Sequence, residues 1–217
     1  MHSTGASGDT EVHDVNDERD PHTRYPSQPT HLTALDLPRP ARSELAPDLQ
    51  KYFAVCDEKI GFLPNVLAAY TFDEQKLRAF IGLYNNLMLE DSPLDKLERE
   101  MIAVVVSSAN RCYYCQVAHG QALRELSGDP ALGELLVMNY RSAHLSQAHR
   151  AMLDFAHKMT VAPDEITADD RAALRAVGFD DRTIWDIAAV AAFFNMTNRM
   201  ATAVDMMPNE QYHSANR

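Results

Sequence analysis

The amino-acid sequence predicts an all-α fold. Apolar residues recur at spacings of three and four through most of the chain after residue 40. Residues that commonly begin helices stand before most of these segments, and glycines follow several of them. No run of alternating apolar and polar residues is long enough to indicate a β-strand. Together these observations predict a bundle of helices around one core.

Composition and charge narrow the class of protein. The chain has 217 residues, of which 46% are hydrophobic, enough for one domain with a sizeable core. A net charge of -11 argues against binding to nucleic acid or to anionic membranes, because both require a basic surface. No apolar run approaches the roughly 18 residues of a membrane-spanning helix. Residues 1–20 lack the apolar core of a secretory signal, so we expect a cytoplasmic protein.

Residues 1–40 differ from the rest of the chain. They are rich in Asp, His, Ser, Thr and Pro and show almost no apolar periodicity. Such a segment buries too little apolar surface to fold by itself. We expect a mobile tail or extended arm over residues 1–40, followed by a helical domain over residues 41–217.

The domain begins with three expected helices. Pro47 is a favourable first-turn residue, and Gly61 ends the helix that follows. Cys56 lies on the apolar side of that helix, which indicates a buried small hydrophobe and not a reactive thiol. Pro64 opens a short helix, and Asp73 caps a longer one whose apolar residues share one face.

The next two helices flank the middle of the chain. The segment Ser92-Pro93-Leu94-Asp95 resembles a capping box with Pro at the first helical position. The run Val104-Val105-Val106 alone would suit a strand, but the start signals and the charged residues 96–100 favour a helix. Asn110 is the expected cap of the following helix, which spans residues 111–126 and ends at Gly128.

The remaining helices follow the same signals. Their expected starts are Asp129-Pro130, Ser146, Thr167 with Asp170, and Asp180 or Asp181, and Gly178 closes the helix that begins at Thr167. The last long helix is apolar on most sides. We therefore expect it to be central or to lie at a subunit interface.

Four residues between positions 100 and 119 carry the chemistry: Glu100, Cys112, Cys115 and His119. Spacings of three and four put the two cysteines and the histidine on one helix face. Cys112 falls in the first turn, where unpaired N–H groups and the helix dipole favour a thiolate. His119 lies one turn beyond Cys115 and is suited to take its proton. Glu100 reaches this pair if the preceding helix packs antiparallel.

A thiolate beside a second thiol is suited to peroxide reduction. Attack on the peroxide leaves a sulfenic acid on sulfur. The second thiol condenses with that group to give a disulfide, which prevents over-oxidation, and a thiol or dithiol reductant restores the pair. These steps require no metal, haem or flavin, so we expect no cofactor.

The spacing of these residues resembles the signature of a known family. Glu, eleven residues, Cys, two residues, Cys, three residues and His is similar to the alkylhydroperoxidase D-like branch of the carboxymuconolactone decarboxylase superfamily. The flanking segments GFLPNVLAAY, LRAFIGLYNNLM and FFNMTNRMA resemble its peroxidase-related subfamily. The resemblance spans roughly residues 45–208. It implies an all-α, AhpD-like helical bundle that assembles as a homo-oligomer, a trimer or a hexamer.

The resemblance also implies roles in the reduction of hydrogen peroxide or alkyl hydroperoxides. Cys115 corresponds to the peroxidatic cysteine and Cys112 to its resolving partner, while His119 and Glu100 correspond to the proton relay. One position departs from the pattern, because Tyr114 stands where well-studied members carry a histidine before the second cysteine. A phenol, with an ordinary pKa near 10, is a poor base at neutral pH. Tyr114 is therefore a candidate relay or pocket residue.

Two other interpretations of the same residues stay open. Cys112, Cys115 and His119 would offer three zinc ligands, with Glu100 or Cys56 as a fourth, although no second Cys-x-x-Cys or His-x-x-x-His pair follows. Alternatively, a Cys112–Cys115 disulfide would regulate assembly in a redox-sensing or scaffold module that catalyses nothing. The peroxidase interpretation is the one we favour.

Overall fold

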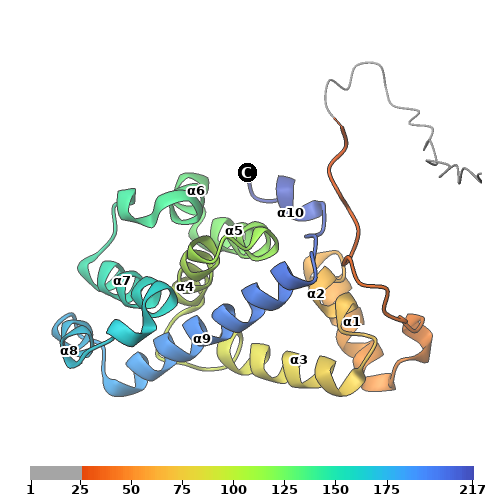
Figure 1. The fold of residues 1–217 in the computed structure, drawn as a ribbon, viewed down its shortest axis with the longest axis horizontal. Helices are drawn as coiled ribbons and strands as arrows, with labels where there is room; N and C mark the ends of the chain where they lie inside the picture. Colours follow the sequence, from red (N-terminus) through yellow and green to blue (C-terminus); the bar gives the residue numbers. More distant parts are fainter. Residues whose placement is uncertain (1–25) are drawn as a thin grey trace, which may run out of the picture.

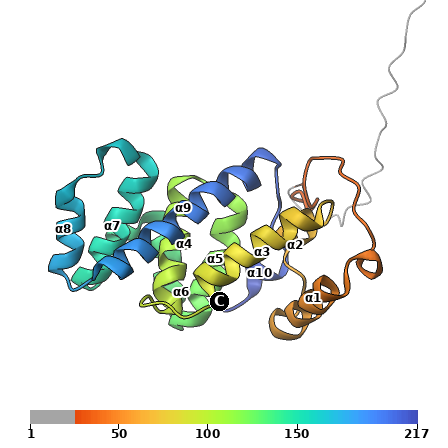
Figure 2. The same ribbon diagram turned by 90° about the horizontal axis from the view of Figure 1, so that it is seen from below.

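Helices supply the regular structure of residues 26–217, the part of the chain that the computed structural model describes (Figures 1 and 2). In chain order the elements are η1 (Arg42–Glu44), α1 (Pro47–Ile60), α2 (Asn65–Ala69), α3 (Glu74–Met88), α4 (Lys96–Ala109), α5 (Tyr113–Ser127), α6 (Pro130–Asn139), η2 (Tyr140–Ser142), α7 (Gln147–Val161), η3 (Pro163–Glu165), α8 (Ala168–Ala176), α9 (Asp181–Ala203) and α10 (Gln211–Ser214). No strand occurs between residues 26 and 217. The predicted all-α class is confirmed.

Helix α4 is the centre of the fold. Its residues 99–107 are all buried, and α5, α6, α7 and α9 pack around it. The predicted helix over the valine run is therefore confirmed. Helix α9 runs diagonally through the middle of Figure 1, with contacts to α3, α4, α5, α7 and α8. It is not enclosed as α4 is, because Trp185, Met196 and Met200 are exposed.

Most of the predicted helix starts and ends are confirmed. The carboxylates of Asp73, Asp129 and Asp180 and the hydroxyl of Ser146 each accept a hydrogen bond from the first turn of the helix they precede. This satisfies N–H groups that a helix start leaves unpaired. Gly61 and Gly128 end α1 and α5 in the left-handed conformation, at φ values of 88° and 64°. Among residues 26–217, no helix combines the length and the apolar content needed to cross a bilayer.

Two predicted helix starts are wrong. Helix α4 begins after Asp95, whose carboxylate and Glu98 form the capping box, so Ser92 and Pro93 stay outside the helix. The Ser92 hydroxyl instead donates to Asp186 of α9, at 2.7 Å. Asn110 does not cap α5 but ends α4, and Cys112 is the residue that precedes α5.

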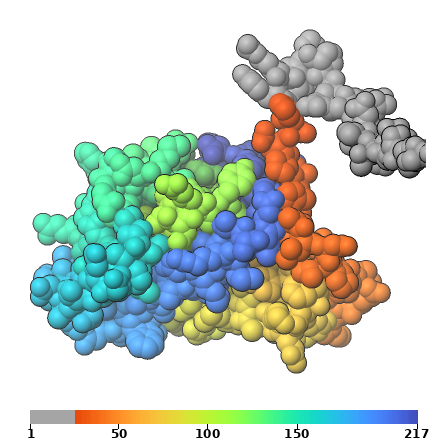
Figure 3. All heavy atoms as spheres, in the orientation of Figure 1, coloured from red at the N-terminus to blue at the C-terminus, as the bar shows by residue number. Residues whose placement is uncertain are grey.

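Residues 26–40 have no helix or strand and run along the C-terminal end of α9, as Figure 3 shows. The Ala34 N–H donates to the Val204 carbonyl at 2.9 Å, and the Met207 N–H donates to the Leu32 carbonyl at 3.3 Å. This contact holds the chain that follows α9. Residues 1–25 of the predicted tail lie outside the described residues, and the boundary at residue 40 stays a prediction.

The crossing of α5 and α6 depends on a glycine. A Cβ added at Gly133 would lie 2.6 Å from Cγ of Arg124, a buried residue that donates to the carbonyls of Tyr212 and Ala215. We expect Gly133→Ala to lower the free energy of unfolding by about 1–3 kcal/mol, because the helices must move apart. Gly82→Ala is the control, since its added Cβ meets nothing within 4 Å and should stabilise by about 0.4–1 kcal/mol. Urea unfolding measures the free energy of unfolding of both variants. Equal changes in Gly133→Ala and Gly82→Ala would contradict a steric role for Gly133.

Candidate active site

The two cysteines stand at a tight turn between α4 and α5. The Arg111 N–H donates to the Ser108 carbonyl and the Cys112 N–H donates to the Ser107 carbonyl, both at 3.0 Å. Arg111 adopts the left-handed conformation at φ 54°, which a non-glycine residue adopts only at a cost. This pair of bonds is a Schellman motif that closes α4. It fixes the backbone of Cys112 at the start of α5.

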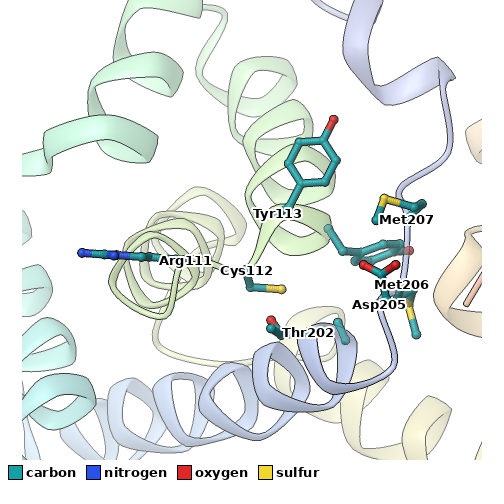
Figure 4. Close-up of a pocket in the computed structure, with 9 residues that line it drawn as sticks. Arg111, Cys112, Tyr113, Thr202, Asp205, Met206 and Met207 are labelled. Atoms are coloured by element: carbon teal, nitrogen blue, oxygen red, sulfur yellow. The ribbon is translucent and has the colours of Figure 1, made fainter. Parts of the chain in front are cut away.

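A cavity of about 110 Å³ opens beside Cys112. Figure 4 shows the Cys112 sulfur pointing from the start of α5 toward Thr202 and the chain that follows α9. The residues that line the cavity are Arg111, Cys112, Tyr113, Tyr114, Ala201, Thr202, Asp205, Met206 and Met207. Cys112 and Cys115 are both buried, with exposed fractions of 1% and 4%. Of the two, only Cys112 lines the cavity.

The surroundings of the two sulfurs move their pKa values in opposite directions. The neighbouring Cys115 thiol is the main cause that lowers the pKa of Cys112, and together with the Cys115 N–H, the Thr202 hydroxyl and the charge of His119 it brings that pKa to about 6 against the cost of burial. The Cys112 side chain makes no cap hydrogen bond to the backbone of α5. The neighbouring Cys112 sulfur, burial and the Cys112 charge raise the pKa of Cys115 well above its usual value. The structure therefore favours a Cys112 thiolate with a protonated Cys115 beside it.

Glu100 and His119 form a direct pair between α4 and α5. Nδ1 of His119 donates to Oε2 of Glu100 at 2.7 Å, and the exposed fractions of the two side chains are only 14% and 10%. The His119 ring packs edge-on against Phe194, with ring centroids 4.6 Å apart. With Nδ1 bound to the carboxylate, Nε2 is the nitrogen left to exchange a proton. No direct hydrogen bond joins His119 to either sulfur within residues 26–217, so its relay role stays a prediction.

Tyr114 anchors α2 and lines the cavity. Its hydroxyl accepts a hydrogen bond from the Val66 N–H at 3.0 Å, in the first turn of α2. Burial is the main cause that raises the pKa of Tyr114 well above its usual range. A phenol that stays protonated does not act as a general base. Of the two roles considered for Tyr114, the geometry favours the pocket.

Several residues around the site were not singled out for it by their sequence. Thr202 and the segment Asp205–Met207 form the far wall of the cavity, about ninety positions beyond the cysteines. Met206 in this wall is buried. Asn198 of α9 is a fully buried polar residue. Its partners are Ser107 and Asn110 of the α4–α5 hairpin.

The zinc interpretation finds no geometric support. Within residues 26–217, no three His, Cys, Asp or Glu side chains come together in a way that would hold a metal ion. Cys56 packs with α2 and α3 in a separate apolar cluster, away from the cluster that contains Cys112 and Cys115. Burial raises the pKa of Cys56, as expected for a structural thiol.

The lowered pKa of Cys112 has a measurable consequence. Since the thiolate is the nucleophile, the rate of Cys112 alkylation by iodoacetamide should rise with pH, with a midpoint at about 6, and level off above pH 7. Cys56 in the same sample serves as the internal control and should react only at alkaline pH. Peptide mass spectrometry separates the two sites. A Cys112 midpoint near 9 would contradict the proposed stabilisation of the thiolate.

Comparison with known proteins agrees with the motif. The pattern that defines the carboxymuconolactone decarboxylase family matches residues 74–158. An uncharacterized peroxidase-related protein from Silicibacter sp. TM1040 has 60% sequence identity and a TM-score of 0.84, over 88% of this chain and 99% of that chain. A second one, the alkylhydroperoxidase AhpD core from Ralstonia eutropha JMP134, has 39% identity and a TM-score of 0.83, over 87% of this chain and 98% of that chain.

A more distant structure shares the fold alone. The debrominase Bmp8 has 23% identity and a TM-score of 0.69, over 87% of this chain and 97% of that chain. No curated protein matches the sequence. The matches to the Silicibacter and Ralstonia proteins cover nearly the whole length of both relatives. They include the segment that the family pattern matches. This chain therefore belongs to the carboxymuconolactone decarboxylase family, as an AhpD-like, peroxidase-related member.

Proposed function

We propose that the protein reduces hydrogen peroxide or small alkyl hydroperoxides through a dithiol–disulfide cycle of Cys112 and Cys115. One observation carries the proposal. A thiol whose pKa is lowered to about 6 lines a cavity of about 110 Å³, with a second thiol, whose pKa is raised, beside it. At neutral pH such a thiol is mostly ionised, which is the form that attacks peroxides.

The cycle balances without a metal or an organic cofactor. The Cys112 thiolate attacks the terminal oxygen of the hydroperoxide, an S–O bond forms, the O–O bond breaks, and the alkoxide takes up a proton to leave as an alcohol. Cys115 then attacks the sulfenic sulfur, and its proton leaves with the hydroxyl group as water. The resulting disulfide is reduced by an external thiol or dithiol, which is itself oxidised.

His119 and Glu100 support the first step through charge. The carboxylate accepts the Nδ1–H of His119, and the positive charge of the protonated imidazole is one of the causes that lower the pKa of Cys112. The same imidazolium is the nearby acid suited to protonate the departing alkoxide. We propose this as the task of the pair.

The size of the cavity suits a small substrate. A volume of about 110 Å³ accommodates a hydroperoxide group with a short alkyl chain, whereas a bulky substrate would require the wall at Thr202 and Met206 to move. We therefore expect hydrogen peroxide and small alkyl hydroperoxides to react faster than lipid hydroperoxides.

Turnover in a coupled assay tests the proposal. The protein, a dithiol reductant and cumene or tert-butyl hydroperoxide should give catalytic loss of hydroperoxide, with the smaller substrate faster. The Cys112→Ser/Cys115→Ser double variant supplies the background rate. A bromopyrrole is included because a structure of the debrominase Bmp8 holds 2,3,4-tribromopyrrole and because a thiolate also attacks bromine. Turnover of the bromopyrrole without turnover of either hydroperoxide would overturn the proposal.

We also propose the homo-oligomer that the resemblance implies, a trimer or hexamer. Trp185 on α9 has an exposed fraction of 73%, and Met196 and Met200 on the same helix are 47% exposed. Large apolar side chains at such exposure are typical of association surfaces. Light scattering of the reduced protein measures the mass, and a monomer at working concentration would contradict this part of the proposal.

A further inference from the structure

Part of the far wall of the Cys112 cavity lies outside any helix. Residues 205–207, which follow α9, line the cavity and lie across it from Cys112 in Figure 4. The segment leaves α9 in a tight turn, closed by the Met206 N–H, which donates to the Ala201 carbonyl at 2.9 Å. In this turn Asp205 adopts the left-handed conformation at φ 50° without being a glycine. That conformation has a cost in free energy, so it requires support from neighbouring groups.

Residues 31–34, which we call the strap, bind this segment on both sides of the turn. The Ala34 N–H donates to the Val204 carbonyl at 2.9 Å, and the Met207 N–H donates to the Leu32 carbonyl at 3.3 Å. The Leu32 side chain is partly buried and packs against the apolar cluster that contains both cysteines of the site. The strap therefore contacts the cavity wall through its backbone and the cysteine cluster through one side chain.

His31 supports the residue in the left-handed conformation. Its Nε2 lies 2.9 Å from Oδ2 of Asp205 and 3.0 Å from the Asp205 carbonyl oxygen. A carboxylate and a carbonyl oxygen only accept hydrogen bonds, so Nε2 carries the hydrogen and shares it between them. The side chains of His31 and Asp205 are 40% and 56% exposed. Exposed polar contacts of this kind contribute little to stability, so local opening of the strap requires little free energy.

The opposite side of the wall segment is held by the body of the protein. Nδ2 of Asn65, the first residue of α2, donates to the Met207 carbonyl at 2.8 Å. The Asn65 N–H donates to Oδ1 of Asn209 at 2.7 Å, and Nδ2 of Asn209 donates to the Leu63 carbonyl at 3.0 Å. These bonds are partly buried, whereas those of His31 are exposed. Of the two supports, the strap is the one whose release disturbs no helix.

We propose that the strap sets the size of the molecule that reaches Cys112, with His31 and Leu32 as the positioning residues that hold the cavity wall. The substrates are those of the proposed function, on which this inference rests. With the strap bound, residues 205–207 enclose a cavity of about 110 Å³, which admits hydrogen peroxide and short alkyl hydroperoxides. When the strap releases, the wall loses its support on one side, and bulky apolar hydroperoxides reach the same sulfur.

The ratio of two alkylation rates at Cys112 tests access directly. Iodoacetamide is small, and iodoacetamidofluorescein carries the same reactive group on a bulky dye, so their ratio cancels any change in the thiolate itself. Peptide mass spectrometry assigns both rates to Cys112. His31→Ala should raise the rate with the bulky reagent about three- to tenfold, because two hydrogen bonds are lost, and leave the rate with iodoacetamide nearly unchanged. Ala34→Pro removes the N–H that binds Val204 and should act in the same direction.

Two further variants make the test specific. His31→Gln keeps a nitrogen donor at the position of Nε2 and should retain the parental ratio. Gln28→Ala changes an exposed residue of the same arm, whose side chain donates to the Pro26 carbonyl and not to the wall, and should also retain it. His31 is itself exposed, so His31→Ala should fold normally and carries the test if Ala34→Pro does not fold. In stopped flow, the rate with cumene hydroperoxide relative to hydrogen peroxide should rise in the same variants.

The outcomes are distinguishable. A raised ratio of bulky to small reagent in His31→Ala, with the parental ratio in His31→Gln and Gln28→Ala, supports the proposal. An unchanged ratio in His31→Ala, or an equal rise in Gln28→Ala, overturns it, because the strap would then not limit access to the cavity. If the parent protein consumes no hydroperoxide, the proposed function fails, and the alkylation ratio still decides whether the strap controls access to Cys112.

Discussion

Replacing Cys112 with Ser is expected to reduce hydroperoxide turnover to the background rate. The substitution removes the sulfur that lines the cavity and has its pKa lowered to about 6. A serine hydroxyl in the same position stays protonated and is a poor nucleophile. Stopped-flow measurement of hydroperoxide loss, with protein in excess, separates the first attack from later steps. Cys56→Ser is the control and should retain the parental rate, because Cys56 lies in another cluster.

The matched variant Cys115→Ser should behave differently. It keeps the Cys112 nucleophile but removes the resolving thiol, so one equivalent of hydroperoxide is consumed and a sulfenic acid remains on Cys112. Trapping with dimedone and peptide mass spectrometry locate that group. The family resemblance implies the reverse order, with Cys115 attacking first. A trapped sulfenic acid on Cys115 in the Cys112→Ser variant would establish that order and contradict the one we derive from the cavity and the pKa values.

Replacing Glu100 with Gln is expected to have the second largest effect. The change removes the carboxylate charge that accepts the Nδ1–H of His119 at 2.7 Å. Since a neutral amide favours positive charge on the imidazole less than a carboxylate does, less positive charge should stand near Cys112 in the variant, and the pKa of Cys112 should rise above 6. We expect the second-order rate with hydroperoxide at pH 7 to fall about 10- to 100-fold, with its pH midpoint displaced to higher pH.

The sign of the pH effect separates this account from simple destabilisation. The thiolate is present above the pKa of Cys112 and is lost as pH falls through it, so raising pH should recover much of the rate of Glu100→Gln. Glu125→Gln on the exposed side of α5 is the control and should keep the parental profile. A uniform loss of rate at every pH would indicate a damaged fold, and circular dichroism at each pH checks for it.

Local sequence signals were sufficient for most of the fold. Asp73, Asp129 and Asp180 were recognisable as caps because each places a short carboxylate directly before an apolar periodic segment. From there it can accept hydrogen bonds from the N–H groups of the first turn. The turn at Arg111 was not recognisable, because its left-handed conformation is held by the Schellman bonds and not by a glycine. The cap of α4 was also misjudged, since Ser92 is bound to Asp186 across a gap of 94 residues.

The residues of the candidate site likewise fall into those that local spacing identified and those that depend on long-range packing. Glu100, Cys112, Cys115 and His119 were identified because their spacing alone brings them to one face and one neighbouring helix. The bond from Val66 to Tyr114 depends on where α2 packs, and no local pattern contains that information. The wall at Thr202 likewise depends on how α9 crosses α5. Long-range packing therefore determines that Cys112, and not Cys115, lines the cavity.

One measurement tests the central claim most directly: intact mass and free-thiol count of the reduced, chelator-treated protein, before and after one equivalent of organic hydroperoxide. We expect the rapid loss of two of the three thiols, those of Cys112 and Cys115, with a fall of about two mass units and an unchanged Cys56. Unchanged thiols would contradict hydroperoxide reduction by this pair. The pair would then serve as a redox-sensing or scaffold element, and comparing oligomer mass with the pair reduced and oxidised would be the next step.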